Sequence, residues 1–244
     1  MTVNDRLTAL RGWMREEKID AYIIPSSDPH QSEYVAEHWK SREWISGFTG
    51  SAGTVVVTVD YAGVWTDSRY FLQGEMETAS SEFELQKMHN QFGNYYRDWI
   101  IDNLSSGQTV AVDGQLFSNG QCDMLKKAFD SEGLKFRIDA DGISPTWTDR
   151  AAIPMNEIYV HDAKYAGKTR TERLNEVRAK MVEQKADHHL TTTLDDIGWT
   201  LNIRGTDIDF NPVAVCYLVV SKTYSTLFID KVKSQKSFFP IIYA

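Results

Sequence analysis

Apolar residues recur at helical spacing in two separate parts of the chain, and each of these stretches is followed by a strand pattern. Residues 5–28 and 172–195 align without a gap and are identical at eight of 24 positions. The apolar positions in each lie at i, i+3 and i+7, which is the stripe of an amphipathic helix. They are Leu7, Leu10 and Met14 in the first stretch and Leu174, Val177 and Met181 in the second. The pattern predicts a helix–strand unit that occurs twice.

The similarity resumes further along, where residues 53–67 and 214–230 each read as two strands joined by a polar turn, and both stretches end in Asp. After Asp230 the sequence soon ends, at Ala244, whereas the first copy continues through further helix and strand patterns. We therefore expect a complete first domain, a linker with ordered aromatic residues, and a truncated second domain of the same type. The expected boundaries are 1–143, 144–171 and 172–244.

The remaining periodicities predict an α/β fold in which a mixed sheet is flanked by helices and the whole arrangement is duplicated, with the second copy incomplete. The sheet is expected to be mixed because 53–59 and 63–67 form a hairpin, while the other strands alternate with helices. The predicted helices are 3–18, 68–78, 93–104, 118–132, 170–185 and 194–203, the last capped by Thr193 or Asp195. The predicted strands are 20–25, 53–59, 63–67, 83–88, 109–113, 134–138, 188–192, 213–220 and 224–230. The expected core comprises Leu7, Leu10, Met14, Ile23, Val55, Val57, Trp65 and Phe71.

Composition narrows the classes of partner. The net charge is −8 and no run of Lys or Arg occurs, so we expect no nucleic-acid partner. No apolar stretch approaches the roughly 20 residues of a membrane span, and the polar N-terminus is not a signal peptide. Cys122 and Cys216 fall in different predicted domains, which favours reduced thiols and a cytoplasmic protein.

Several residue clusters invite a metal or catalytic interpretation, and each has a structural alternative. His188 and His189 are neighbours on a predicted strand, so they point to opposite faces and are not expected to share an ion. Asp195 and Asp196 begin a helix, where carboxylates interact favourably with the helix dipole. The Asp207-x-Asp209 pair could bind a cation only with more donors, so a loop role is favoured.

Two further segments resemble catalytic or phosphate-binding motifs. Ser26, Asp28 and His30 lie in one segment, whereas a triad normally draws its members from separate segments, so capping of a turn is favoured. The Gly-rich stretch 47–53 precedes a strand rather than a helix, which disfavours a phosphate-binding loop. A tight loop packed near another domain is the expected alternative.

Arg69 is the residue whose position most favours ligand binding. It follows a strand that ends at Asp67 and opens a helix, so it lies at a sheet edge where ligands often approach. A guanidinium there could bind a peptide carbonyl or carboxylate with two hydrogen bonds. The alternative is an ion pair with Asp67 or Glu75.

Five sequence stretches carry a resemblance to a known family. They are AYIIPSSDPHQSEY (21–34), SGFTGSAGTVVVT (46–58), VWTDSRYFLQ (64–73), WTDR (147–150) and TLDDIGWTLNIRGTDIDFNPV (193–213). Together they resemble the N-terminal half of the three-domain Xaa-Pro aminopeptidases (aminopeptidase P), metallopeptidases with creatinase/prolidase-like N-terminal domains. The resemblance implies two such domains ahead of a catalytic "pita-bread" domain. It also implies cleavage before a proline at the second position of a peptide, with two divalent metal ions, expected to be manganese. In that family the arginine of the TD-x-RYF motif, here Arg69, extends toward the substrate.

The chain departs from the family in one respect that bears on function. The family's metal ligands lie in the C-terminal domain, which we expect to be absent here, so no catalytic residue and no metal ligand is assigned to this chain. The resemblance then implies a non-catalytic portion that shapes substrate access, inactive by itself. A stand-alone creatinase-type binding or assembly module is the alternative. We expect a monomer or a weak homodimer, with the apolar tail 238–242 folding back over the incomplete second domain.

Overall fold

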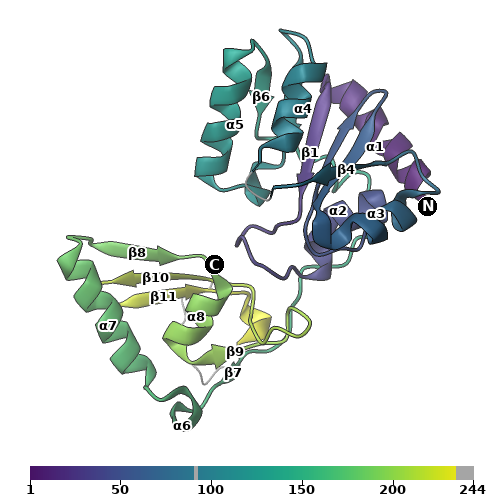
Figure 1. Cartoon of the computed structure of the whole chain (residues 1–244). Coiled ribbons are helices and arrows are strands. Elements are labelled where there is room, and N and C mark those ends of the chain that lie inside the picture. Colours follow the sequence, from purple (N-terminus) through teal and green to yellow (C-terminus); the bar gives the residue numbers. More distant parts are fainter. Residues whose placement is uncertain (91–92, 235–244) are drawn as a thin grey trace. The chain divides into compact units, whose positions relative to one another are not determined.

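The chain divides into two units, each built around its own sheet (Figure 1). The structure is a computed structural model that describes residues 1–90 and 93–234. The first unit contains residues 1–31 and 38–151, and the second contains 32–37 and the residues from 152 onward. Within the described ranges, no helix is long and apolar enough to cross a membrane. The predicted tail segment 238–242 lies outside the described residues.

The first unit contains a six-stranded mixed sheet in the order β4-β3-β2-β1-β5-β6. Strand β2 pairs antiparallel with both β1 and β3, whereas β4 pairs parallel with β3, β5 parallel with β1, and β6 parallel with β5. The mixed α/β class predicted from the hairpin is therefore confirmed. The strands are β1 (Ala21–Pro25), β2 (Thr54–Thr58), β3 (Ala62–Asp67), β4 (Glu84–Met88), β5 (Thr109–Val112) and β6 (Lys135–Arg137).

Helices cover both faces of this sheet. On one face, the stripe of Leu7, Leu10 and Met14 is fully buried against Tyr22 and Ile24 of β1. On the other face, the indole of Trp99 lies 5.5 Å from that of Trp65, which brings α4 onto β3. The helices are α1 (Val3–Glu17), α2 (Ser41–Ser46), α3 (Phe71–Thr78), α4 (Tyr95–Asn103) and α5 (Asn119–Ser131), with short 3-10 turns η1 (Glu37–Trp39), η2 (Ser68–Tyr70) and η3 (Gly114–Leu116).

The predicted core is correct except at one position. Leu7, Leu10, Met14, Ile23, Val55, Val57 and Trp65 are all buried. Phe71 is only partly buried because it begins α3 at the rim of the sheet. There its ring lies beside His89 and beneath the Lys87 ammonium group. An apolar residue just after a strand end can therefore lie at the rim of a sheet and not in its core.

The second unit repeats part of this architecture with a three-stranded sheet in the order β11-β10-β8. Its main elements are α7 (Arg170–Glu183), β8 (His188–Thr191), α8 (Leu194–Leu201), β10 (Tyr217–Ser221), β11 (Ser225–Phe228) and η4 (Lys231–Lys233). A separate two-stranded pair, β7 (Tyr159–Val160) with β9 (Ile203–Arg204), and the short α6 (Ala163–Ala166) were not predicted. Thr193, one of the two predicted capping residues, occupies the N-cap position of α8, but its side chain makes no capping hydrogen bond.

The strand registers of the two units coincide. Ile23 of β1 lies opposite Val56 of β2, and Leu190 of β8 lies opposite Val219 of β10. One constant offset in residue number, which we call the helix offset, relates Ile23 to Leu190 and the first helix to its copy. A second, the hairpin offset, relates Val56 to Val219. The hairpin offset also maps every residue pair between β2 and β3 onto one between β10 and β11. The sequence repeat is therefore a structural duplication.

Individual interactions are duplicated too. Thr2 and Thr169 each close a capping box at the start of α1 and α7. The Arg11 side chain donates from Nε to the Thr58 carbonyl at 3.0 Å, and Arg178 donates to the Ser221 carbonyl at 3.0 Å. Conservation of such contacts within one chain shows that both copies fold by the same local rules.

The two copies differ at the edge of the first strand. In the first unit, β1 pairs with β2 on one side and with β5 on the other. In the second unit, among the described residues, β8 pairs with β10 alone, and its Leu190 side chain is 60% exposed. As far as residues 1–90 and 93–234 show, β8 therefore has one edge of backbone polar groups without a partner strand, whereas β1 has a partner on both edges.

Candidate functional site: the Arg69 turn

Arg69 lies on the 3-10 turn η2, directly after the C-terminal end of β3. Asp67 ends that strand, and its carboxylate accepts the Arg69 backbone N–H at 3.0 Å, which starts the turn. The same carboxylate accepts from the guanidinium at 2.8 Å (Nε) and 2.7 Å (Nη2). The strand end thus fixes both the backbone and the side chain of Arg69.

The ion pair leaves more than half of the Arg69 side chain exposed. The Arg69 side chain is 57% exposed and that of Asp67 is 7% exposed. Hydrogen bonding from Arg69 holds the pKa of Asp67 below its ordinary value, and the same contact raises the pKa of Arg69. Because a guanidinium has five N–H donors and Asp67 takes two of them, the remaining N–H groups can bind a carbonyl or carboxylate. Of the two structural partners considered from sequence, Asp67 is the one used, while Glu75 pairs with Lys87 at 2.5 Å.

A buried arginine that the sequence did not single out organises the loop beside this turn. Arg42 of α2 donates to the Ser26 hydroxyl at 2.6 Å, to the Phe48 carbonyl at 2.5 Å and to the Gly50 carbonyl. Burial lowers the pKa of Arg42 to about 10. No spacing or motif around a lone arginine ahead of a glycine-rich stretch indicates this role.

The loop formed by residues 47–53 contacts the Arg69 turn. The Ser51 hydroxyl lies 2.6 Å from the Tyr70 hydroxyl, and the Arg69 guanidinium lies 5.1 Å from the centroid of the Tyr70 ring. At Gly50 a Cβ would lie 2.3 Å from the Phe48 ring, so a side chain there would displace the loop. The glycine-rich stretch therefore folds around Arg42 and supports Tyr70.

The second unit has the same turn without the arginine. Asp230 caps η4 by accepting the Val232 N–H at 2.9 Å, and the hairpin offset relates Asp230 to Asp67. Val232 therefore occupies the position of Arg69. The duplication kept the turn, but only the first copy carries a guanidinium there.

The other clusters considered from sequence have structural roles. The Ser26 hydroxyl donates to the Gly53 carbonyl at 2.7 Å, and Asp28 accepts the backbone N–H of His30 at 2.9 Å. These bonds belong to a turn, and they do not align a nucleophile with a base. Asp195 and Asp196 lie in the first turn of α8, as expected for carboxylates at the positive end of a helix.

The Asp207-x-Asp209 pair is divided between two environments. Asp207 is fully buried and accepts from the Lys233 ammonium at 2.5 Å and from the Val215 N–H at 2.7 Å, whereas Asp209 is exposed. His188 and His189 are adjacent on β8, on opposite sides of the strand. Within the part of the chain that the structure describes, no three His, Cys, Asp or Glu side chains are grouped so as to hold a metal ion. The described residues therefore do not fit a metal pair.

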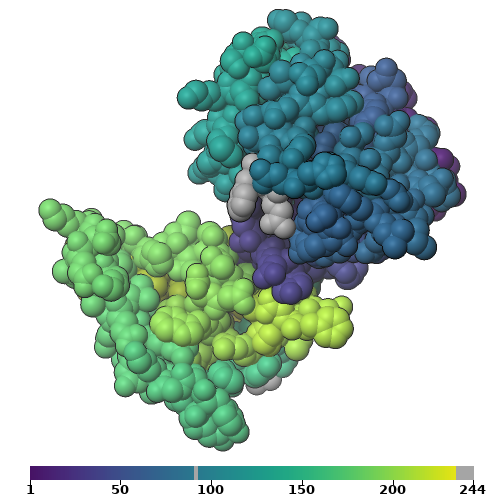
Figure 2. Space-filling view, viewed as in Figure 1, coloured from purple at the N-terminus to yellow at the C-terminus, as the bar shows by residue number. Residues whose placement is uncertain are grey.

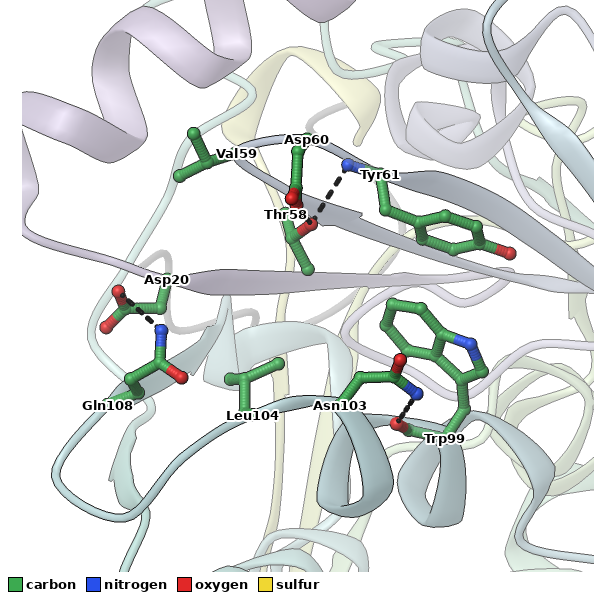
Figure 3. Close-up of a pocket in the computed structure, with 9 residues that line it drawn as sticks. All are labelled: Asp20, Thr58, Val59, Asp60, Tyr61, Trp99, Asn103, Leu104 and Gln108. Carbon is green, nitrogen blue, oxygen red and sulfur yellow. Dashed lines mark hydrogen bonds between the residues drawn. The ribbon is translucent and has the colours of Figure 1, made fainter.

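A pocket of about 410 Å³ lies in the first unit between the β2–β3 turn and the end of α4 (Figure 3). Its aromatic wall is a stack of Tyr61 on Trp99, with ring centroids 4.3 Å apart. Asp20, at one end of the pocket, accepts from the Gln108 amide at 3.1 Å and from the Thr109 N–H at 2.7 Å. These bonds fasten β5 to the start of β1, so the carboxylate has a structural role.

Comparisons with known proteins agree with the duplicated fold. The family model of the Creatinase/Prolidase N-terminal domain matches residues 6–143, and a second model of the same description matches residues 149–240. An Xaa-Pro aminopeptidase 1 from Dictyostelium discoideum is 38% identical over 96% of this chain, and an aminopeptidase P2 from Arabidopsis thaliana is 39% identical over 96%. The chain spans 38% and 33% of their respective lengths.

A solved structure extends the similarity to three dimensions. The crystal structure of an X-prolyl aminopeptidase from Caenorhabditis elegans, described as a cytosolic enzyme with a di-nuclear active site, matches with a TM-score of 0.90 and 33% identity. The match covers 97% of this chain and 40% of the worm enzyme. Two family-model matches, a duplicated register and this close structural match lead to one conclusion: the chain belongs to the creatinase/prolidase N-terminal domain family and is similar to the Xaa-Pro aminopeptidases within it.

Proposed function

We propose that this chain is the N-terminal, non-catalytic portion of an Xaa-Pro aminopeptidase-like metallopeptidase, and that it shapes access of peptides to a catalytic part carried elsewhere. The observation that carries the proposal is the match of 97% of the chain to 40% of a di-nuclear X-prolyl aminopeptidase. The substrate class is a peptide with a free N-terminus and proline at the second position. The two metal ions, with manganese the expected metal, belong to the catalytic part.

Arg69 is the substrate-binding residue in this proposal. Its guanidinium is exposed, held at the end of β3 by Asp67, and has unused N–H donors. Preorganisation of this kind lowers the entropy lost when a ligand binds. A planar guanidinium matches a peptide carbonyl or a C-terminal carboxylate better than a lysine ammonium does. The role therefore requires an arginine and not merely a positive charge.

The proposed cellular compartment rests on a relative and on the two cysteines of this chain. The C. elegans protein is described as cytosolic, and Cys122 and Cys216 of this chain are both free thiols. A reducing compartment keeps such thiols from forming disulfides. We propose a cytoplasmic location and, because the dimer contacts of the intact protein would lie largely outside this segment, a monomer or weak homodimer for this chain alone.

A chimaera tests the role of Arg69. The chain replaces the matching segment of the 38%-identical Dictyostelium relative, and hydrolysis of Xaa-Pro peptides is measured with added manganese. Loss of a charge-assisted hydrogen bond to substrate predicts that Arg69→Ala lowers kcat/KM by about 10- to 100-fold. Arg69→Lys should recover only part of that loss, since an ammonium cannot form the paired geometry.

Arg137→Ala provides a matched control. Arg137 is also partly exposed and also pairs with an aspartate two residues away, Asp139, at 3.1 Å, but it lies on β6. The Arg137→Ala substitution should leave kcat/KM unchanged. Equal losses for Arg69→Ala and Arg137→Ala would indicate a general effect of surface charge, and unchanged kinetics for Arg69→Ala would reject a substrate role.

A further inference from the structure

The second unit contains an apolar groove of about 660 Å³ between α7, β8 and α8. Figure 2 shows α7 and α8 at the surface of this unit. The side chains that line the groove and matter for the argument are Val177, Lys180, Met181, His189 and Trp199. A volume of this size is typical of recognition sites for several side chains rather than of packing defects.

The duplication identifies the equivalent surface in the first unit. The helix offset relates His189 to Tyr22. Trp199 corresponds to Trp44 because each indole lies against the equivalent arginine: the Arg6 guanidinium is 5.5 Å from the Trp44 ring, and that of Arg173 is 4.4 Å from the Trp199 ring. Each arginine also donates a hydrogen bond to the carbonyl of its own tryptophan.

In the first unit this surface is covered by a turn formed by residues 140–147. The Tyr22 hydroxyl donates to the Ala140 carbonyl at 2.8 Å and accepts the Gly142 N–H at 3.0 Å. Trp147 stacks on Trp44 with centroids 5.1 Å apart and planes at 13°. Ile143, which comes between these residues in the sequence, belongs to the hydrophobic core of the first unit.

The equivalent side chains of the second unit, Trp199 and His189, have the stacking surface and the hydrogen-bonding groups that such a turn needs. Trp199 is 44% exposed although the Arg173 guanidinium lies against its ring, whereas Trp44 is 8% exposed. His189 replaces Tyr22, and an imidazole can both accept and donate hydrogen bonds to a backbone. The groove therefore has an indole for stacking, an apolar floor and a polar side chain at the position that binds the turn's backbone.

We propose that this groove is a docking site for a turn segment that carries an aliphatic residue followed by a tryptophan, whose indole stacks on Trp199. The occupant is a later part of the same polypeptide in a longer form of the protein. Two observations support this source: the spacing of the repeat places the equivalent of residues 140–147 beyond residue 244, and the relatives are much longer than this chain. The proposal concerns folding and assembly, and does not depend on a substrate role for Arg69.

A peptide copied from the first unit tests the groove. The probe is a synthetic peptide of residues 138–149, added to the ¹⁵N-labelled chain and followed by amide chemical shifts. A covalently linked segment acts at an effective concentration on the order of 1 mM, so binding with a Kd of about 1 mM is sufficient. Saturable shifts confined to α7, β8 and α8 are expected. No shifts at up to about 5 mM peptide, well above that effective concentration, would overturn the proposal.

Two variants and two alternative occupants complete the experiment. Replacing the tryptophan of the peptide with alanine should weaken binding at least about tenfold, because an aromatic pair and its buried area are lost. This substitution leaves the protein itself unchanged. Trp199→Ala in the chain should abolish binding, whereas Phe210→Ala, at a fully exposed residue of the same unit, should not. A chain that dimerises through the groove without peptide would identify a second copy as the occupant and contradict the proposal. If the peptide binds only after residues 235–244 are removed, that segment is the occupant, and this result would equally contradict the proposal.

Discussion

The buried ion pair between Lys233 and Asp207 gives a stability prediction with a definite sign. Their side chains are 2% and 0% exposed, and Asp207 also accepts the Val215 N–H at 2.7 Å. The Lys233 backbone carbonyl accepts the Ile158 N–H at 2.9 Å, so the pair fastens η4 to two other segments of the second unit. Lys233→Met would leave a buried carboxylate without its counter-charge, which costs about 3–5 kcal/mol.

The informative comparison is between the single and the double variant. Removing the charge from Asp207 in the Lys233→Met background should restore part of the lost stability, because an uncompensated buried charge is worse than a neutral pair. A loss of about 3–5 kcal/mol is a large fraction of the 5–15 kcal/mol that stabilises a typical domain. We therefore expect the order of stability to be wild type, then Lys233→Met/Asp207→Asn, then Lys233→Met.

Urea unfolding followed by ¹⁹F NMR of fluorotryptophan measures the stability of the second unit, which contains the ion pair, because Trp199 is the tryptophan of that unit. Lys222→Met is the matched control, because Lys222 also pairs with an aspartate, Asp187, but both side chains are more than half exposed. Such an exposed pair contributes little. The reasoning is refuted if Asp207→Asn further destabilises Lys233→Met, or if Lys222→Met costs as much as Lys233→Met.

The Asp67–Arg69 ion pair, the two cysteines and the edge of β8 can each be tested. Because Arg69 lowers the pKa of Asp67 below 3.8, the pair stabilises the fold above that pH and this stability is lost on acidification; Asp67→Asn should flatten the dependence of the melting temperature on pH below about 4. Cys216 is buried and its burial raises its pKa to about 12, whereas Cys122 is partly exposed. Alkylation at pH 8 followed by mass spectrometry should therefore label Cys122 in the native protein and Cys216 only after unfolding. In a dilute monomer, the amides of 188–191 should exchange faster than those of 21–24, because β1 is paired on both edges. Equal protection would show that the second unit needs no further strand.

The sequence predicted those elements whose pattern is local. Leu7, Leu10 and Met14 follow a strict helical period, and residues 53–67 form two strand patterns separated by a polar turn. The predicted bounds of this helix and of both strands therefore agree with the structure to within a residue or two. The duplication was readable for the same reason, since identical spacing of apolar residues gave the same register. Phe71 was misplaced because hydrophobicity alone does not separate a core position from the rim of a sheet.

The interactions that the sequence could not provide are those between distant segments. The pairing of β7 with β9 involves two residues from each strand, too few for a period to appear. Arg42 and Lys233 are single charged residues whose partners come from other loops, and a charged residue is expected at the surface unless its partners are known. By contrast, Asp67 lies two residues from Arg69, so their ion pair could be named among the alternatives from sequence.

The central claim is that this chain is a non-catalytic portion of a peptidase, and one assay tests it most directly. The purified chain is incubated with Xaa-Pro peptides and added manganese, cobalt or zinc, and release of the N-terminal residue is measured. We predict no turnover with any of the three metals, because no metal-binding cluster occurs among residues 1–90 and 93–234. Turnover that survives repurification and disappears on chelation would contradict the account.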